Sequence, residues 1–228
     1  MTAHVFVDDL DAPRLHDDDR HHLARVLRLK LGELVTVSDG CGRWRSCRFG
    51  PELEVDGDIV DDPAPSPPIG IAFALSKADK PELAVQKLTE VGADTIVLVR
   101  AERSVVRWDD ERAARGRARL RRVAREAAMQ CRRSRLPTVD GPISFDEALR
   151  LPGASLADRG GRTPTLARPT VLVGPEGGWS EQERAAASDA GVPAVGLGPH
   201  VLRAETAAVA AGVLLAGLRS GLVAGGSV

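Results

Sequence analysis

Aromatic side chains and lysine are scarce in this chain of 228 residues, which has four phenylalanines, three tryptophans and no tyrosine. Proteins that hold unstacked bases commonly stack them on aromatic rings, and few rings are available here. Lys30, Lys77, Lys80 and Lys87 are the only lysines, so arginine carries most of the positive charge. The arginine fork suits phosphates and base edges better than an ammonium group does. Any binding of nucleic acid should therefore rest on arginine and depend steeply on salt.

Cysteines are few, and neither a secretory signal nor a long apolar run is recognisable in the sequence. Cys41, Cys47 and Cys131 are odd in number and have no C-x-x-C spacing, which supports neither a disulfide framework nor a zinc site. The N-terminus turns acidic within eight residues, unlike a secretory signal. The longest apolar stretch, residues 206–218, is shorter than the roughly 18 residues of a membrane span. We therefore expect a cytoplasmic protein without a bound metal.

The charge of the chain is unevenly distributed. Residues 1–65 carry 8 basic and 14 acidic side chains, a net charge of −6, while residues 66–228 carry 23 and 18, a net charge of +5. Four prolines in residues 61–68 stiffen the chain between these two parts. These features predict two domains, residues 1–65 and residues 66–228.

The first part contains short runs in which apolar and polar residues alternate, separated by turns with Gly and Asp. This pattern is typical of a small antiparallel sheet or barrel. A single helix is expected to interrupt the strands. Asp17, Asp18 and Asp19 suit its positive N-terminal end. Its buried stripe is predicted to consist of Leu23, Val26, Leu27 and Leu31.

The second part alternates apolar strands with helices, which predicts a parallel sheet flanked by helices. The expected strands are residues 69–75, 94–100, 171–173 and 194–197. The expected helices are residues 79–91, 110–134, a segment starting at 180, and 205–218, the last apolar all round and so buried in the domain or against a partner subunit. Residues 141–169 are interpreted mostly as a connection, apart from a short helix at 145–150.

The segment of residues 171–183 carries the sharpest local signal. A buried strand ends in Gly174-Pro175-Glu176-Gly177-Gly178, and Ser180 with Glu183 has the spacing of a capping box. Glycines let the backbone approach a ligand closely, and loops at the carboxyl ends of parallel strands are where such sheets bind ligands. Neither a Walker A nor a G-x-G-x-x-G pattern is present. A ligand loop and a simple tight turn fit this segment about equally well.

A second loop, Gly196 to His200, leads through Arg203 into the last helix. Glu205 and Thr206 suit a helix start, which explains them without any further role. Arg203 lies where the helix dipole disfavours a cation, so it is predicted to have an electrostatic task.

The predicted helix of residues 110–134 is rich in arginine. Between residues 112 and 135 there are ten arginines and one acid, Glu126. Arginines recur at helical spacing on one face, at Arg112, Arg115, Arg119 and Arg122. Such unbalanced charge favours an anionic partner such as nucleic acid, and Arg115, Arg119 and Arg122 are predicted to bind RNA. Gln130 and Arg133 are three residues apart and project together.

Six segments, in order along the chain, closely resemble the RsmE-type 16S ribosomal RNA uridine N3-methyltransferases of the SPOUT class. They are HHLARVLR (21–28), SKADKPELAVQKLTEVG (76–92), AERS (101–104), REAAMQCRRSRLPTV (125–139), VGPEGGWSEQE (173–183) and LGPHVLRAETA (197–207). The resemblance implies a PUA-like β-barrel followed by an α/β domain with a trefoil knot. It also implies a homodimer, S-adenosylmethionine as cofactor, and 16S ribosomal RNA or the small ribosomal subunit as partner.

The resemblance also implies roles for individual residues. The first cofactor loop is matched by Gly174, Pro175, Glu176, Gly177 and Gly178, and the second by Leu197, Gly198, Leu202, Arg203, Glu205, Thr206 and Ala207. Positions near the target base are matched by Glu90, Arg103, Gln130 and Arg133, and the RNA-facing helix of the barrel by His22, Arg25 and Arg28. One departure is Arg132, where the family usually has glycine.

Methylation of uracil N3 requires loss of a proton, and negative charge then spreads onto the neighbouring carbonyl oxygens. Arg203, Arg133 and Gln130 are the expected donors to those oxygens. Glu205, Glu90 or solvent is the expected proton acceptor. Two other functions stay open: a SPOUT enzyme that methylates a ribose hydroxyl, and a noncatalytic RNA-binding factor in ribosome assembly. Naked RNA and an assembled subunit are both open as substrates.

Overall fold

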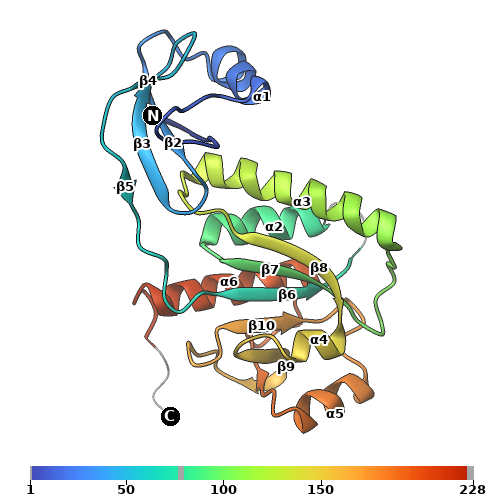
Figure 1. The fold of residues 1–228 in the computed structure, drawn as a ribbon. Helices are drawn as coiled ribbons and strands as arrows, with labels where there is room; N and C mark the ends of the chain where they lie inside the picture. The colour runs from blue at the N-terminus through green and yellow to red at the C-terminus, as the bar shows by residue number, and fades with distance from the viewer. Residues whose placement is uncertain (1, 77–79, 225–228) are drawn as a thin grey trace. The chain divides into compact units, whose positions relative to one another are not determined.

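The computed structural model of the chain describes residues 2–76 and 80–224 and divides into two compact units. The first unit contains residues 1–65 together with residues 125–136, and the second contains residues 66–124 and 137–228. Helix α3 (Asp110–Cys131) is continuous and contributes residues to both. The sequence had assigned residues 125–136 to the second part of the chain alone. The two units are described separately below (Figure 1).

The first unit is built on a five-stranded sheet with the order β1-β2-β3-β4, in which β5 also pairs with β3. Its strands are β1 (Ala3–Phe6), β2 (Leu34–Ser38), β3 (Arg43–Arg48), β4 (Glu54–Val55) and β5 (Val60–Asp61). The predicted small sheet is present, but β1 and β2 are parallel rather than antiparallel. A parallel pair needs a crossover connection, and the helical segment between the two strands provides it.

The helical segment of the first unit is shorter than the sequence indicated. Helix α1 (Asp17–His21) continues into a single π-helical turn, η1 (His22–Val26). Of the predicted stripe only Leu23 is buried, while Val26, Leu27 and Leu31 are 61%, 49% and 74% exposed. The prediction for those three residues was wrong because Val26 lies in the π-helical turn, whose spacing differs from that of an α-helix, and Leu27 and Leu31 lie beyond the last helical residue. The chain reverses at Arg28, whose φ is +54°, and the Leu29 N–H then donates to the Leu23 carbonyl.

Arg125 and Asp19 form the strongest ion pair of the first unit. The Arg125 guanidinium donates two hydrogen bonds to the Asp19 carboxylate, at 2.9 and 2.5 Å, and its carbon lies 5.7 Å from the centre of the Phe6 ring. Asp19 is buried, so its charge is compensated by arginine and not only by the start of helix α1. Together with the bond from Ser38 Oγ to the Ser134 carbonyl, this pair fastens residues 125–136 to the sheet.

We expect Arg125→Ala to destabilise the first unit by about 3–5 kcal/mol, because removing one partner of a buried pair leaves the other charge uncompensated. Denaturant unfolding of the full chain measures this loss. The control is Arg122→Ala on the exposed side of the same helix, with an expected change of less than about 0.5 kcal/mol. Equal stability of the two variants would contradict the assignment.

His4 gives the first unit a predictable response to pH. The side chain is 6% exposed, and its Nδ1 lies 2.8 Å from Thr36 Oγ1. Burial lowers the pKa of His4 to about 4, against an opposing effect of the Arg133 backbone, and the charge of Arg132 adds to the lowering. The folded state therefore holds His4 neutral at pH values where the unfolded chain binds a proton.

Stability contributed by neutral His4 should be fully present above pH 6.5 and should fall as the pH drops towards 4, by about 3 kcal/mol in total. Denaturant unfolding at a series of pH values tests this. His4→Gln should flatten the curve between pH 6.5 and 4. A His4→Gln curve as steep as that of the parent would remove His4 as the cause.

The second unit is a six-stranded, wholly parallel sheet with the order β11-β9-β10-β6-β7-β8. Its strands are β6 (Gly70–Ala74), β7 (Thr95–Arg100), β8 (Thr138–Ser144), β9 (Ala154–Arg162), β10 (Thr170–Val173) and β11 (Ala194–Val195). Its further helices are α2 (Lys80–Val91), α4 (Phe145–Leu149), α5 (Glu181–Asp189) and α6 (Ala204–Arg219). The predicted parallel sheet flanked by helices is confirmed (Figure 1). The predicted first residue of helix α2, Asp79, lies outside the described residues.

Each face of this sheet has its own apolar core. Helices α2 and α6 pack on one face around Ile71, Phe73 and Leu88, and helices α4 and α5 pack on the other around Leu172 and Trp179. At Gly212 of α6, an added Cβ would lie 2.7 Å from Leu88 Cδ2, so glycine permits the close approach of α6 to α2. Helix α6 is not buried all round, as Val213 is half-exposed.

The interpretation of residues 141–169 as mostly a connection was wrong. Strand β8 runs into this segment although it contains Pro142. The proline follows Gly141, whose φ is +95°, and the pairing of β7 with β8 is irregular close to this point. Proline is tolerated in a strand at such an irregularity. Strand β9 lies wholly within the segment. Only its first three residues, 154–156, are fully buried, and the rest is polar and glycine-rich, so the sequence offers no apolar run there. Among the helices of the described residues, none is both long and apolar enough to cross a membrane.

Candidate functional site

The loop after β10 is held by one buried carboxylate. Ser180 and Glu183 form the predicted capping box at the start of α5: Ser180 Oγ accepts from the Glu183 N–H, and Glu183 Oε2 accepts from the Ser180 N–H at 2.8 Å. The second oxygen of Glu183 accepts from the Glu102 N–H, also at 2.8 Å. Glu183 thus joins the loop after β10 to the loop after β7.

Arg103 adds a second link between these two loops. Its guanidinium donates to the Gly177 carbonyl at 3.0 Å, within a turn closed by a hydrogen bond from the Gly178 N–H to the Pro175 carbonyl. Gly178 has φ +66°, a conformation that favours glycine. Gly178 is therefore required by the shape of the loop, and Arg103 supports that shape.

The loop after β11 carries the chain to α6. It starts with a hydrogen bond from the Gly196 N–H to the Arg162 carbonyl, and Gly198 has φ +135°. Arg203 is the N-cap residue of α6, yet its exposed side chain makes no capping hydrogen bond. The predicted position of Arg203 at the helix start is confirmed.

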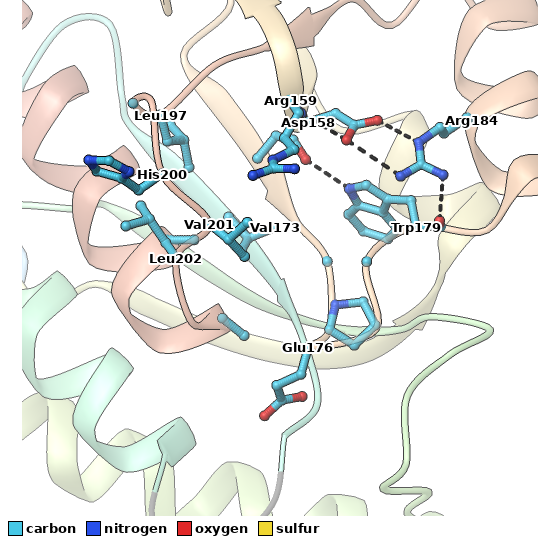
Figure 2. A pocket seen from close by; sticks show the side chains of 17 residues that line it. Asp158, Arg159, Val173, Glu176, Trp179, Arg184, Leu197, His200, Val201 and Leu202 are labelled. Carbon is cyan, nitrogen blue, oxygen red and sulfur yellow. Dashed lines mark hydrogen bonds and ion pairs between the residues drawn. The ribbon is translucent and has the colours of Figure 1, made fainter.

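The two loops enclose an open cavity of about 220 Å³ at the carboxyl edge of the sheet (Figure 2). Eight of the residues predicted to bind the cofactor line it: Gly174, Pro175, Glu176, Gly178, Leu197, Gly198, Leu202 and Ala207. The other four predicted residues, Gly177, Arg203, Glu205 and Thr206, are not among its lining residues. Val173, Val201 and Leu202 give one part of the cavity an apolar surface (Figure 2).

Family models match most of the chain. A model described as RNA methyltransferase domain matches residues 63–216, and one described as RNA methyltransferase PUA domain matches residues 15–51. Ribosomal RNA small subunit methyltransferase E of Mycobacterium bovis is 37% identical over 215 residues, with 85% of this chain and 82% of the relative covered. The chain belongs to the ribosomal RNA small subunit methyltransferase E family. The resemblance found in the six sequence motifs is thereby confirmed.

Other proteins are similar to this chain in sequence or in fold. The Bacillus subtilis protein of the same name is 28% identical, with 83% of this chain and 84% of the relative covered. The structure of the Neisseria gonorrhoeae methyltransferase E bound to S-adenosyl methionine has a TM-score of 0.79 at 31% identity, with 96% and 98% of the two chains covered. A Legionella pneumophila putative methyltransferase in complex with the same cofactor has a TM-score of 0.80 at 25% identity, with 94% and 97% covered.

One wall of the cavity in this methyltransferase was missed by the sequence analysis. It consists of Ala157, Asp158 and Arg159 of β9 together with Trp179 and Arg184. Figure 2 shows Asp158 beside Trp179 and Arg184. The Trp179 indole N–H donates to the Ala157 carbonyl at 3.1 Å, and the ring packs on Phe145. Because β9 was interpreted as a connection, no pattern in the sequence brought these residues to the two loops.

Asp158 and Arg184 form an ion pair in this wall. Arg184 Nε lies 2.5 Å from Asp158 Oδ2, and Arg184 Nη1 donates to the Trp179 carbonyl at 2.7 Å. Burial alone would raise the pKa of Asp158, but hydrogen bonds from Arg184 and from the Arg159 N–H hold it below its usual value. The carboxylate therefore stays charged beside the cavity.

The arginine-rich helix is less unbalanced in charge than its sequence suggests. At least five of the seven arginines in α3 lie within ion-pair distance of a carboxylate: Arg112, Arg115, Arg119, Arg121 and Arg125. Arg115 pairs with Glu111 at 2.7 Å, and Arg119 pairs with Glu82 at 3.0 Å. The prediction of a basic face without acidic partners was therefore only partly right. Arg115, Arg119 and Arg122 of this helix were predicted to bind RNA, and among the described residues only Arg122 of these three has no carboxylate within ion-pair distance.

The remaining predicted residues lie in both units. His22, Arg25 and Arg28 are exposed at the end of the first unit's helical segment. Gln130 and Arg133 also belong to the first unit, at the end of α3. Between them Arg132 has φ +58°, which explains why glycine is usual at that position and shows that arginine is accommodated there. Glu90 lies on α2 in the second unit and pairs with Lys87 at 2.8 Å.

We expect Glu183→Ala to lower stability by about 2–3 kcal/mol, because it removes a helix cap and also leaves the Glu102 N–H without its acceptor. Thermal or denaturant unfolding measures the change. Glu147→Ala is the matched control, since Glu147 completes the same capping box on α4 at an exposed position, and we expect a smaller loss there. Equal losses in the two variants would mean that the bond to Glu102 contributes nothing.

Proposed function

We propose that this protein transfers a methyl group from S-adenosylmethionine to N3 of a uridine in 16S ribosomal RNA. The observation that carries the proposal is the cavity between two glycine-containing loops, in a chain of the methyltransferase E family. The Neisseria gonorrhoeae member of that family is described as bound to S-adenosyl methionine, which supports the same cofactor here.

The residues around the cavity suit a nucleoside with a charged side chain. Val173, Leu197 and Val201 offer an apolar surface to an adenine ring. At Gly198 an added Cβ would meet nothing within 4 Å, and φ +135° excludes most other residues, so backbone can face the ligand there. Asp158 and Arg184 supply opposite charges for an amino acid moiety. When bound, S-adenosylmethionine supplies a methyl group already activated on its sulfonium.

The protein then has to align the acceptor nitrogen and manage one proton and one developing charge. Arg203, exposed at the start of α6 and free of a capping role, is proposed to donate to a uracil carbonyl oxygen as negative charge develops. Gln130 and Arg133 are proposed as further donors on the basis of the sequence motif. Glu205 is proposed to accept the N3 proton, because its Oε2 is buried and accepts no hydrogen bond within the described residues.

Binding of RNA is proposed to use exposed arginines in both units. The first unit is proposed to bind RNA through His22, Arg25 and Arg28. The second unit is proposed to bind it through Arg122, which does not have to break an ion pair first. Arg103, Arg115 and Arg119 would first exchange a protein acceptor for a phosphate. The substrate is proposed to be 16S RNA, free or in the small subunit, and the site of action to be the cytoplasm. A homodimer would cover the half-exposed Val213 of α6.

The test is methylation of small subunits from a strain that lacks this protein, with the product nucleoside identified by mass spectrometry. N3-methyluridine is the expected product, whereas a ribose-methylated nucleoside would overturn the proposed target atom. Calorimetry with S-adenosylmethionine should show binding. Absence of both binding and methylation would favour a noncatalytic assembly factor.

Arg203→Ala should lower the methylation rate by about 100-fold or more, as losing one donor to a developing oxyanion typically does. Binding of S-adenosylmethionine should change little, because Arg203 does not line the cavity. Arg150→Ala, a change at an exposed arginine next to α4, is the control and should methylate at the parent rate. An Arg203→Ala protein with full activity would remove Arg203 from this role.

A further inference from the structure

Lys80, one of only four lysines in the chain, lies between two carboxylates that come from the two cavity loops. Its Nζ is 2.7 Å from Glu176 Oε1 and 3.8 Å from Glu205 Oε2. Glu176 belongs to the loop after β10, and Glu205 lies in the first turn of α6, directly after the loop that follows β11. A single ammonium group thus connects segments about 30 residues apart in the sequence, at the point where both reach the cavity.

The position of Lys80 is otherwise unfavourable. Lys80 is the first residue of α2, where the helix dipole disfavours a positive charge. The hydrogen bond with Glu176 raises the pKa of Lys80, so the ammonium group stays charged. Without that charge, two carboxylates would face each other across the cavity edge, one of them only 12% exposed. Repulsion between them would push the two loops apart.

We propose that Lys80 is a positioning residue that holds the two loops together around the methyl donor and thereby places Glu205 and its neighbour Arg203 for the reaction. Lys80 itself does not line the cavity, whereas Glu176 does, so it acts through its partners. The proposed role rests on the proposed function, since it concerns the same cavity and the same two α6 residues.

Stability and positioning make different predictions for this ion pair. Lys80 and Glu176 are 28% and 43% exposed, and ion pairs of that exposure contribute little to folding. A purely structural surface pair would therefore leave stability, cofactor affinity and rate all near the parent values. A positioning pair would leave the melting temperature nearly unchanged while lowering cofactor affinity and rate.

The experiment uses the full chain and four variants: Lys80→Met, Lys80→Arg, Glu176→Gln and the double variant Lys80→Met with Glu176→Gln. Calorimetry gives the Kd for S-adenosylmethionine, and single turnovers with small subunits at saturating cofactor give the methylation rate. Arg150→Met is the control for loss of an exposed positive charge. Melting temperatures show that each variant is folded.

We expect Lys80→Met to weaken S-adenosylmethionine binding about tenfold, within the usual range for coupling between sites, and to slow the single turnover further. Lys80→Arg should restore most of both, because a guanidinium reaches the same two carboxylates. The double variant should be no worse than Lys80→Met alone, since both changes break one link. Lys80→Gln, which keeps a polar head group, covers the case in which Lys80→Met does not fold.

Three results would overturn the proposal: parent-like affinity and rate in Lys80→Met, equal losses in Lys80→Met and Lys80→Arg, or additive losses in the double variant. Equal losses would point to a direct contact of Lys80 with a ligand. The proposed function fails separately, if the parent protein makes no N3-methyluridine. In that case the calorimetric pattern alone still decides whether Lys80 holds the loops.

Discussion

The cavity depends on one buried carboxylate with two backbone donors. Glu183 accepts the N–H of Ser180 with one oxygen and the N–H of Glu102 with the other. The first bond fixes where α5 begins, and the second fixes the loop after β7 against the loop after β10. A glycine-rich loop loses more conformational entropy on ordering than most segments do, so it needs such fastening to keep one shape. The bond from Arg103 to the Gly177 carbonyl holds the middle of the same loop.

Local signals in the sequence were sufficient for the parts of the site that depend on neighbouring residues. A capping box is formed by two residues three positions apart in the sequence, and Ser180 and Glu183 form it as expected. The apolar runs of β6, β7 and β10 are buried on both faces, so their composition revealed them. The position of Arg203 at a helix start followed from the apolar stretch after it.

Parts of the structure that depend on residues far apart in the sequence could not be predicted from local patterns. Strand β9 pairs with β10 and β11 through its backbone, and its polar outer half has no pattern of its own. The wall made by Asp158 and Arg184 was therefore missed together with the strand. Leu27 and Leu31 follow helical spacing in the sequence, but the helix ends first, at a reversal that the residue type of Arg28 does not announce. Counting charge along α3 alone overlooked Glu82 and Asp140, which come from other elements.

The continuity of α3 through both compact units limits how the protein can be divided. The proline-rich segment at residues 61–68 looks like a natural place to cut, but a fragment ending there would lack Arg125 and the residues up to 136. Asp19 would then lose its counterion, and the Ser38 hydroxyl would lose one of its two carbonyl acceptors, that of Ser134. The first unit is thus completed by a segment that follows β6, α2, β7 and the first part of α3, all of which belong to the other unit, so a fragment of consecutive residues that holds the whole first unit must also hold those elements.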